Sequence, residues 1–263
     1  IGLAGVGLSL TYSILNFANF AHGDYLTLGA FSGWSVAYVI AGLGTIDLAS
    51  LILVDAPSSN VGASVTNTPV AVVVGLVVAI VVTVALGLAL DRAVYKPMRN
   101  SEGISLLIAS IGVAFILRYL AALIFGTGRR GITAPSEIPS MTVLGVQVNA
   151  HQLTILVVAL VAMMAIHLLL QRTKIGKAMR AMADNRDLAR IAGIPTERMI
   201  TATWVLGSGL AGASGYMLVL ARGTLGFNDG YLLLLLIFAA VILGGIGSVY
   251  GAIVGGLLIG ITS

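Results

Sequence analysis

The sequence contains no cysteine and very little charge. The lack of cysteine excludes disulfides, thiolate nucleophiles and cysteine-ligated metal sites. Only 9% of the 263 residues are charged and 58% are hydrophobic, whereas soluble domains carry about 25% charged residues. A water-soluble fold could not cover its surface with so few charges. The composition therefore predicts a chain whose solvent is the lipid bilayer.

The motifs of several enzyme classes are also absent. Gly176-Lys177 lacks the leading glycine of a nucleotide-binding P-loop because residue 171 is Gln, so no Walker-type ATP site is present. The sequence has no HExxH zinc motif and no GxSxG nucleophile motif. His22, His151 and His167 do not have the spacing of metal ligands. We expect a chain that is not an enzyme and has no metal or cofactor of its own.

Glycine and long apolar runs are what the sequence does have. An interior glycine costs a soluble helix about 0.5–1 kcal/mol relative to alanine, but small residues let helices in a membrane approach closely. The 33 glycines therefore fit an all-α, polytopic membrane helix bundle. The apolar runs that predict its helices cover residues 1–15, 25–44, 70–90, 104–125, 153–170 and 200–220.

The last apolar run extends from Tyr231 to Ser263 without a charged residue. One straight helix of this length would measure about 50 Å, against a hydrocarbon core of about 30 Å. We predict a break at Gly244-Gly245-Ile246-Gly247-Ser248, with one of the two resulting elements only part-spanning. Small residues every four positions indicate tight helix packing. The residues predicted to make it are Gly244, Gly245, Gly247, Gly251, Gly255 and Gly256.

These runs predict seven to eight hydrophobic elements in a single transmembrane domain over residues 1–263. The chain begins at Ile1 inside one apolar run and stops at Ser263 just after another. We therefore expect sequence to be missing at both ends.

Positive charge fixes the predicted orientation. Ten of the fourteen Lys and Arg residues lie in two loops, 91–103 and 171–199, and an excess of Lys and Arg marks cytoplasmic loops. The same loops account for the net charge of +4, so we expect no nucleic-acid partner.

This orientation predicts that cysteines introduced at Ala183 and Ser59 will be labelled from opposite faces of the membrane. Ala183 lies in the basic loop 171–199, whereas Ser59 lies in the segment 45–69, which has no Lys or Arg. The measurement is accessibility to a membrane-impermeant thiol reagent. Labelling of both from one side would refute the topology.

A polar stretch separates the first two apolar runs. Its residues Asn16, Asn19, His22, Asp24 and Tyr25 fit either a cytoplasmic turn or a helix break that lines a polar path within the membrane, where ionisable groups usually face a cavity or a partner. We favour the second interpretation and treat these five residues as candidates for a substrate pathway. His22 itself is best explained as a structural residue bonded to a carbonyl. Arg118, inside another apolar run, is expected to face protein or the outer water.

The basic loop 171–199 has a helical, amphipathic pattern from Lys177 to Ile191, ended by Gly193 and Pro195. It could lie on anionic lipid or dock on a cytoplasmic protein. Its small alanines and the acidic residues between its basic ones favour a protein partner. The residues predicted to make that contact are Gly176, Ala178, Arg180, Ala181, Asp184, Asn185, Ala189 and Arg190.

Four stretches together resemble a known family. They are Asn19-Phe20-Ala21-His22-Gly23-Asp24, the basic segment Arg92–Arg99, the loop Gly176–Gly193 and the glycine-rich segment Leu243–Gly256. The chain resembles, over nearly its whole length, the LivH-type inner-membrane permeases of ATP-binding-cassette importers for branched-chain amino acids. The LivM-type partner permeases carry a different stretch in place of the first motif. Permeases for urea and short amides share these motifs.

The resemblance implies a multi-pass protein of the inner or plasma membrane that moves substrate by alternating access. It implies a heterodimer with a LivM-like permease, two cytoplasmic ATPase subunits that hold ATP and Mg²⁺, and an extracytoplasmic substrate-binding protein. The loop 171–199 would then be the segment that couples to an ATPase.

Composition alone leaves three other classes open. An ion-coupled secondary transporter would need acidic groups in its spans, and Asp24 is the candidate here. A membrane-embedded enzyme would have to be built from His22 and Asp24. In a channel, the basic loop 171–199 would have no partner protein to contact.

Overall fold

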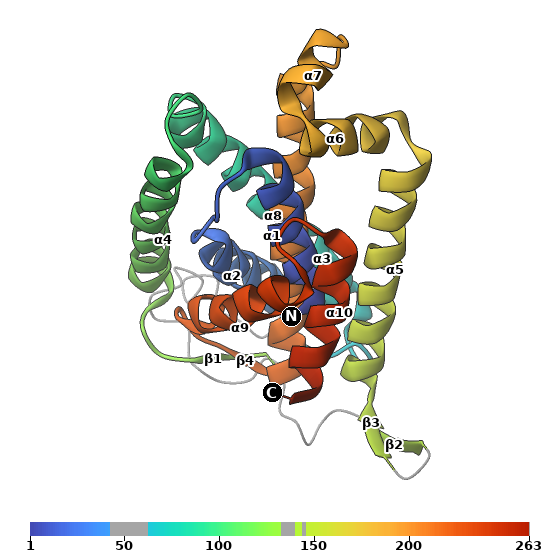
Figure 1. Ribbon diagram of the computed structural model, residues 1–263. Helices are drawn as coiled ribbons and strands as arrows, with labels where there is room; N and C mark the ends of the chain where they lie inside the picture. Colours follow the sequence, from blue (N-terminus) through green and yellow to red (C-terminus); the bar gives the residue numbers. More distant parts are fainter. Residues whose placement is uncertain (43–62, 133–139, 144–145, 263) are drawn as a thin grey trace.

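The computed structural model describes residues 1–42, 63–132, 140–143 and 146–262. The apolar helices are α1 (Gly2–Leu15), α2 (His22–Ala41), α3 (Pro69–Leu90), α4 (Gly103–Phe125), α5 (Ala150–Arg172), α8 (Thr196–Arg222), α9 (Asp229–Gly244) and α10 (Val249–Thr262) (Figure 1). A π-helical turn, Asp91–Tyr95, extends α3. Two polar helices, α6 (Lys174–Asp184) and α7 (Arg186–Ile191), join α5 to α8. These helices confirm the predicted polytopic membrane bundle.

The apolar helices fall into three length classes, and α2, with 20 residues, lies between the other two. Those that contain α3, α4, α5 and α8 have 23 to 27 residues and are long and apolar enough to cross a membrane. Helices α1, α9 and α10 have 14 to 16 residues, which corresponds to about 21–24 Å and is shorter than a hydrocarbon core of about 30 Å. The bundle is therefore a mixture of spanning and part-spanning elements.

Helix α8 is the centre of the bundle and packs on α1, α2 and α3 (Figure 1). Its glycines permit this, because a Cβ at Gly212 or Gly215 would overlap the backbone of α3 or α2. Large side chains fill the spaces between these close approaches, among them the fully buried Trp34, Trp204 and Tyr216. In contrast, α4 packs mainly on α2, and most of α5 faces outward.

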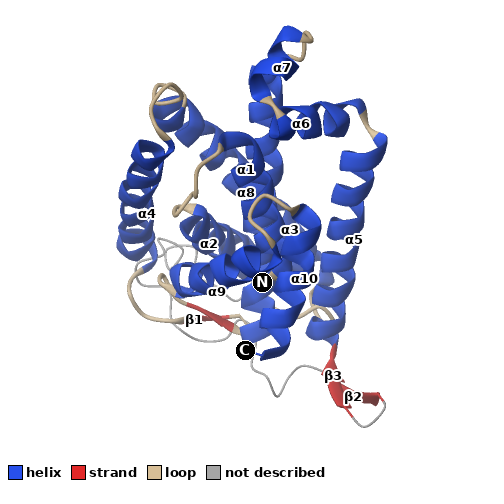
Figure 2. Cartoon of the chain, in the orientation of Figure 1, coloured by secondary structure: helices blue, strands red, loops and turns tan. Residues whose placement is uncertain are grey.

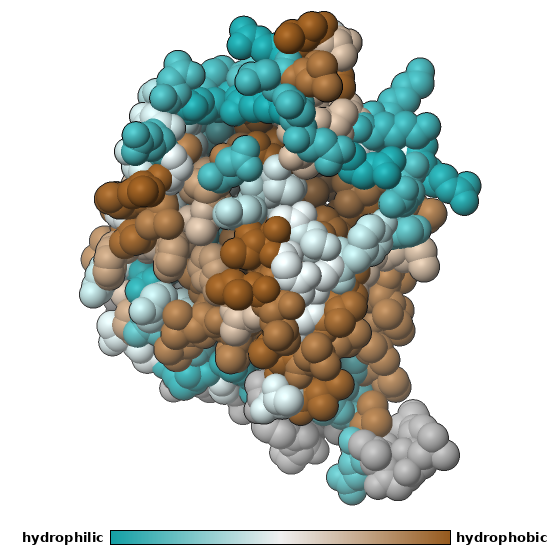
Figure 3. Space-filling model, in the orientation of Figure 1, coloured by the Kyte–Doolittle hydropathy of each residue, from teal (hydrophilic) through white to brown (hydrophobic). Residues whose placement is uncertain are grey.

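The two ends of the bundle differ in structure (Figure 2). One end carries the turn after α3 together with α6 and α7. The other carries short antiparallel strands: β1 (Arg130–Gly131) pairs with β4 (Thr224–Leu225), and β2 (Ser140–Val143) pairs with β3 (Val146–Asn149). The space-filling view shows a hydrophilic cap over the α6–α7 end and an apolar surface below it (Figure 3). Ser59 lies outside the described residues, and the exposed Gln147 on β3 offers a second labelling site at the strand end.

The C-terminal apolar run breaks where the sequence predicted. Helix α9 ends at Gly244 and α10 begins at Val249, with Gly245 and Gly247 at φ of 94° and 87°, a conformation that favours glycine. The two short helices pack against each other through Gly244 and Gly251, where a Cβ on either would overlap the backbone of the other.

Gly255→Ala should destabilise the protein by about 1–3 kcal/mol, the usual cost of overpacking. A Cβ there would overlap the carbonyl of Ala240, so α9 and α10 would have to separate. Gly260→Ala, in the same helix with nothing within 4 Å of the added Cβ, is the matched control and should be neutral or stabilising. Thermal unfolding in detergent measures both, and equal stability of the two variants would contradict the packing role.

Candidate translocation and coupling sites

The break between α1 and α2 reaches into the bundle. Asn16 ends α1 in the left-handed conformation (φ 56°), with its backbone N–H donating to Tyr12, and its side chain is exposed. Six residues later the chain re-enters a helix at His22. Between them the backbone N–H of Phe20 donates to Ser110 Oγ at 3.0 Å. Ser110 lies two turns inside α4, so the break follows α4 away from the polar end.

The polar side chains that follow Asn16 are buried. Asn19 Oδ1 accepts hydrogen bonds from the Ala21 backbone N–H at 3.1 Å and from the Tyr95 hydroxyl at 3.4 Å. His22 Nε2 donates to the Ala4 carbonyl at 3.0 Å, which is the structural contact expected for this histidine. Within the described part of the chain, Asn19 Nδ2 has no acceptor. A buried donor of this kind needs water or a ligand.

Aromatic side chains surround Asn19. The Tyr95 ring stacks on Trp204 with centroids 5.0 Å apart, and Tyr25 meets Trp204 edge-on at 6.4 Å. Phe17 lies 5.3 Å from Tyr95. Trp204 Nε1, like Asn19 Nδ2, is buried without a partner among the described residues. The first turn of α2, the end of α3 and α8 thus enclose a group of unpaired donors within an aromatic wall.

Asp24 forms a bidentate ion pair with Arg118. Arg118 Nε and Nη2 donate to the two carboxylate oxygens at 3.1 and 3.0 Å, and both residues are buried. The guanidinium lies 4.0 Å from the Tyr231 ring centroid and 5.5 Å from that of Phe115. Arg118 therefore faces protein, as expected, and the sequence had not indicated its partner 94 residues away. The pair joins the first turn of α2 to the middle of α4.

The prediction of a single helix in the loop 171–199 is wrong, because the structure has two helices there, α6 and α7. Asn185 leaves the helical conformation, and its side chain caps α7 by accepting from the Leu188 N–H. Asparagine is among the best N-cap residues, so a new helix starts there. Helix α6 runs across the end of the upright α5 (Figure 1) and turns its buried Gly176, Met179 and Met182 inward.

The residues predicted to contact a partner divide into three groups. Gly176 and Ala189 are buried within this chain, and a Cβ on Gly176 would overlap the last turn of α5. Ala178 and Ala181 are half-buried. The residues open to a partner are Arg180, Asp184, Asn185 and Arg190.

The sequence analysis did not identify the most exposed apolar side chains of this segment as contact residues. On α7, Leu188 is 63% exposed and Ile191 is 83% exposed. They are three positions apart and so lie on one face of the helix. Figure 3 shows the hydrophobic surface at the tip of α7, above the hydrophilic cap. Apolar spacing was the available signal, but it cannot distinguish an inward from an outward face.

A hydrogen-bond chain ties α6 to two membrane helices. Arg180 Nη1 donates to Gln171 Oε1 at 3.2 Å, and Gln171 Nε2 donates to the Tyr250 hydroxyl at 2.9 Å. His167 Nδ1 lies 2.9 Å from the same hydroxyl. The chain borders a cleft of about 490 Å³ between α6 and the ends of α1, α5 and α10. A displacement of α6 would therefore reach α5 and α10 directly.

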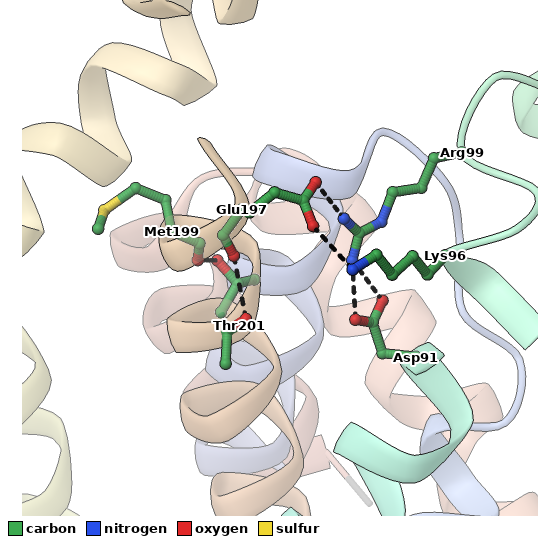
Figure 4. Close-up of polar contacts among 7 residues, drawn as sticks. Asp91, Lys96, Arg99, Glu197, Met199 and Thr201 are labelled. Atoms are coloured by element: carbon green, nitrogen blue, oxygen red, sulfur yellow. Dashed lines mark hydrogen bonds and ion pairs between the residues drawn. The ribbon is translucent and has the colours of Figure 1, made fainter. Parts of the chain in front are cut away.

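A second polar cluster joins the α3–α4 turn to the start of α8 (Figure 4). Arg99 donates to Asp91 at 2.8 and 3.0 Å and also to Glu197, which lies 3.6 Å from Lys96. Burial by itself lowers the pKa of Arg99, but its bonds to Glu197 and Asp91 outweigh burial and raise it. The cluster borders a cleft of about 480 Å³, lined also by Asn100, Arg186, Asp187, Arg190 and Thr196. Among the described residues no group of three His, Asp or Glu could hold a metal ion.

Comparison with known proteins gives one consistent result. The family model described as "Branched-chain amino acid transport system / permease component" matches residues 1–263. The chain is 30% identical over 265 residues to the high-affinity branched-chain amino acid transport system permease protein LivH of Escherichia coli (strain K12), covering 98% of this chain and 79% of that protein. It is 28% identical to BraD of Pseudomonas aeruginosa over the same shares.

An archaeal protein extends this similarity. The probable branched-chain amino acid transport permease protein LivH of Methanocaldococcus jannaschii is 30% identical over 270 residues, with 99% of this chain and 75% of that protein covered. No solved structure matches the chain significantly. The match over the whole described bundle, with its buried motif at Asn19–Asp24 and its helical loop, places the chain in the family of branched-chain amino acid transport permeases.

Proposed function

We propose that this chain is a permease subunit of an ATP-driven importer that carries branched-chain amino acids by alternating access. The observation that carries the proposal is the family match over residues 1–263, together with relatives named for this transport. The sequence has no nucleotide-binding motif. In the proposed importer, ATP and Mg²⁺ are held by two separate cytoplasmic ATPases, as the family resemblance implies. A LivM-like second permease and an extracytoplasmic binding protein complete the importer.

The coupling segment is the pair of helices α6 and α7. Leu188 and Ile191 provide exposed apolar anchors, and the charged residues around them give a mixed-sign rim that fits a protein partner. Gly176 fixes α6 against the end of α5, and Arg180, Gln171 and Tyr250 extend the connection to α10. Movement of a docked ATPase would thereby move membrane helices as units.

The substrate pathway runs past the α1–α2 break. Asn19, His22, Asp24 and Tyr25 are buried beside α3, α4 and α8, which supports a place in the bundle interior. The exposed Asn16 would stand at the cytoplasmic end of this pathway. Because Asp24 is neutralised by Arg118, it is a poor coupling acid for an ion-driven transporter, and this favours the ATP-driven mechanism.

Reconstitution tests the proposed function. Vesicles containing this chain with its partner permease, ATPases and binding protein should accumulate radiolabelled leucine, isoleucine and valine when ATP is supplied. Hydrolysis-deficient ATPase subunits are the control and should abolish accumulation. Uptake that persists with those subunits would contradict an ATP-driven importer, and competition by urea or acetamide instead of valine would assign the chain to the amide permeases.

A further inference from the structure

The Asp24–Arg118 pair has the charge pattern of an amino acid. It presents a carboxylate and a guanidinium side by side, and two aromatic rings, Tyr231 and Phe115, border the guanidinium. Both charged groups lie in apolar helices, where ionisable residues are costly and usually functional. Arg118 Nη1 donates to no protein acceptor among the described residues, although Arg has five N–H donors.

We propose that Asp24 and Arg118 bind the two charges of a zwitterionic aliphatic amino acid, which exchanges with their mutual ion pair during transport. The inference rests on the proposed function and names the substrate-recognising groups within it. Arg118 would take the α-carboxylate in the planar, two-bond geometry that it now gives Asp24. Asp24 would take the α-ammonium, and the aliphatic side chain would lie against Tyr231 and Phe115.

Charge balance makes this exchange feasible. Removing one member of a buried ion pair leaves an uncompensated charge and is strongly destabilising. A zwitterion brings one charge of each sign, so both residues keep a partner before, during and after binding. An amine or a carboxylic acid lacking the other charge would leave one residue without a partner. The pair therefore selects for molecules that carry both charges.

The packing around the pair allows access. Asp24 is fully buried on α2, and the rings that border the Arg118 guanidinium come from α4 and α9. Those covering residues are partly open, with Tyr231 38% exposed and Phe115 51% exposed. Helix α4 itself packs mainly on α2. Rotation of one ring or a small shift of α4 would uncover the guanidinium.

The alternative is an ion pair that only fastens α4 to α2. The chain offers a matched control for distinguishing the two, since Arg129 forms a similar bidentate pair with Asp229 at 3.0 and 3.2 Å, with Arg129 half exposed at the strand end of the bundle. We compare neutral double variants of each pair, Asp24→Asn with Arg118→Met and Asp229→Asn with Arg129→Met. The first leaves no lone charge, and the second leaves only Arg222, which lies 3.9 Å from Asp229 and has a side chain that is 45% exposed.

The experiment measures thermal stabilisation of the assembled importer, without binding protein, by three ligands at equal millimolar concentration. The ligands are leucine, 3-methylbutylamine, which lacks the carboxylate, and 4-methylpentanoate, which lacks the ammonium. Leucine should raise the Tm of the wild type and of the Arg129–Asp229 variant by a few degrees, and neither analogue should. The Asp24–Arg118 variant should assemble but show no shift with leucine.

Three results would overturn the inference. They are an unchanged leucine shift in the Asp24–Arg118 variant, an equal shift with either analogue in the wild type, or no leucine shift in the wild type. ATP-driven leucine uptake by the wild-type importer is measured in parallel. If the wild type takes up leucine but one of these three results is obtained, only the proposed site is refuted. Absence of leucine uptake by the wild type refutes the proposed function.

Discussion

Leu188→Asp combined with Ile191→Asp should abolish ATP-driven uptake while the chain still inserts and pairs with its partner permease. The two side chains form the exposed apolar face of α7, the helix that projects furthest from the polar end of the bundle (Figure 1). Buried apolar anchors at an interface are worth about 2 kcal/mol or more each. Their replacement by charges should weaken ATPase binding by roughly a hundredfold or more.

The control is Leu188→Met with Ile191→Leu, which keeps the face apolar and similar in volume. Retention of the ATPase on the tagged permease, together with leucine uptake in vesicles, measures both variants. The apolar variant should behave as wild type. If the charged variant retained the ATPase and full uptake, α7 would not be the docking element, and the loop would return to the interpretation of a helix lying on lipid.

This choice of residues corrects the sequence-based one. The sequence predicts partner contacts at Ala181 and Ala189, since small residues permit close protein contact, but Ala189 is buried against its own chain and Ala181 is half-buried. A bulky charge at Ala189 would disturb the packing of α7 before it met any partner. Amphipathic spacing identifies two faces of a helix, but only the tertiary structure shows which of them is already covered.

Most of the fold could be predicted from the sequence. Uninterrupted apolar runs predicted the membrane helices because the bilayer imposes a length of about 20 apolar residues on a span. The glycine cluster at Gly244–Ser248 predicted the α9–α10 break for the same reason, since a run of 33 residues is too long for one span. The split at Asn185 was missed because a favourable N-cap inside a helical pattern competes only weakly with helix continuation.

The sequence predicted only part of the candidate site. The segment Asn16–Tyr25 was recognised because polar groups between apolar runs are costly in lipid. The residues that contact this segment were not predicted. Tyr95, Arg118 and Trp204 come from the end of α3, from α4 and from α8, and they are distant from it in sequence. Such contacts follow from how helices pack, and that depends on the small residues of α8 rather than on the motif itself.

Removing Arg118 alone should be far more damaging than removing the whole ion pair. Arg118→Met leaves the Asp24 carboxylate fully buried, with no other hydrogen-bond donor among the described residues. Breaking a buried pair in this way costs about 3–5 kcal/mol. Asp24→Asn should be milder, because the guanidinium keeps its two aromatic neighbours and can extend toward the surface past the partly exposed Tyr231.

The double variant Asp24→Asn with Arg118→Met decides whether charge or shape holds α4 to α2. It removes both charges while keeping similar volumes, so it should recover most of the stability lost in Arg118→Met. Thermal unfolding of the assembled permease in detergent, read for all three variants, gives the coupling between the two residues. If the double variant were as unstable as Arg118→Met, the cost would come from lost packing around the arginine stem, and the ion pair would not be what neutralises Asp24 in the membrane.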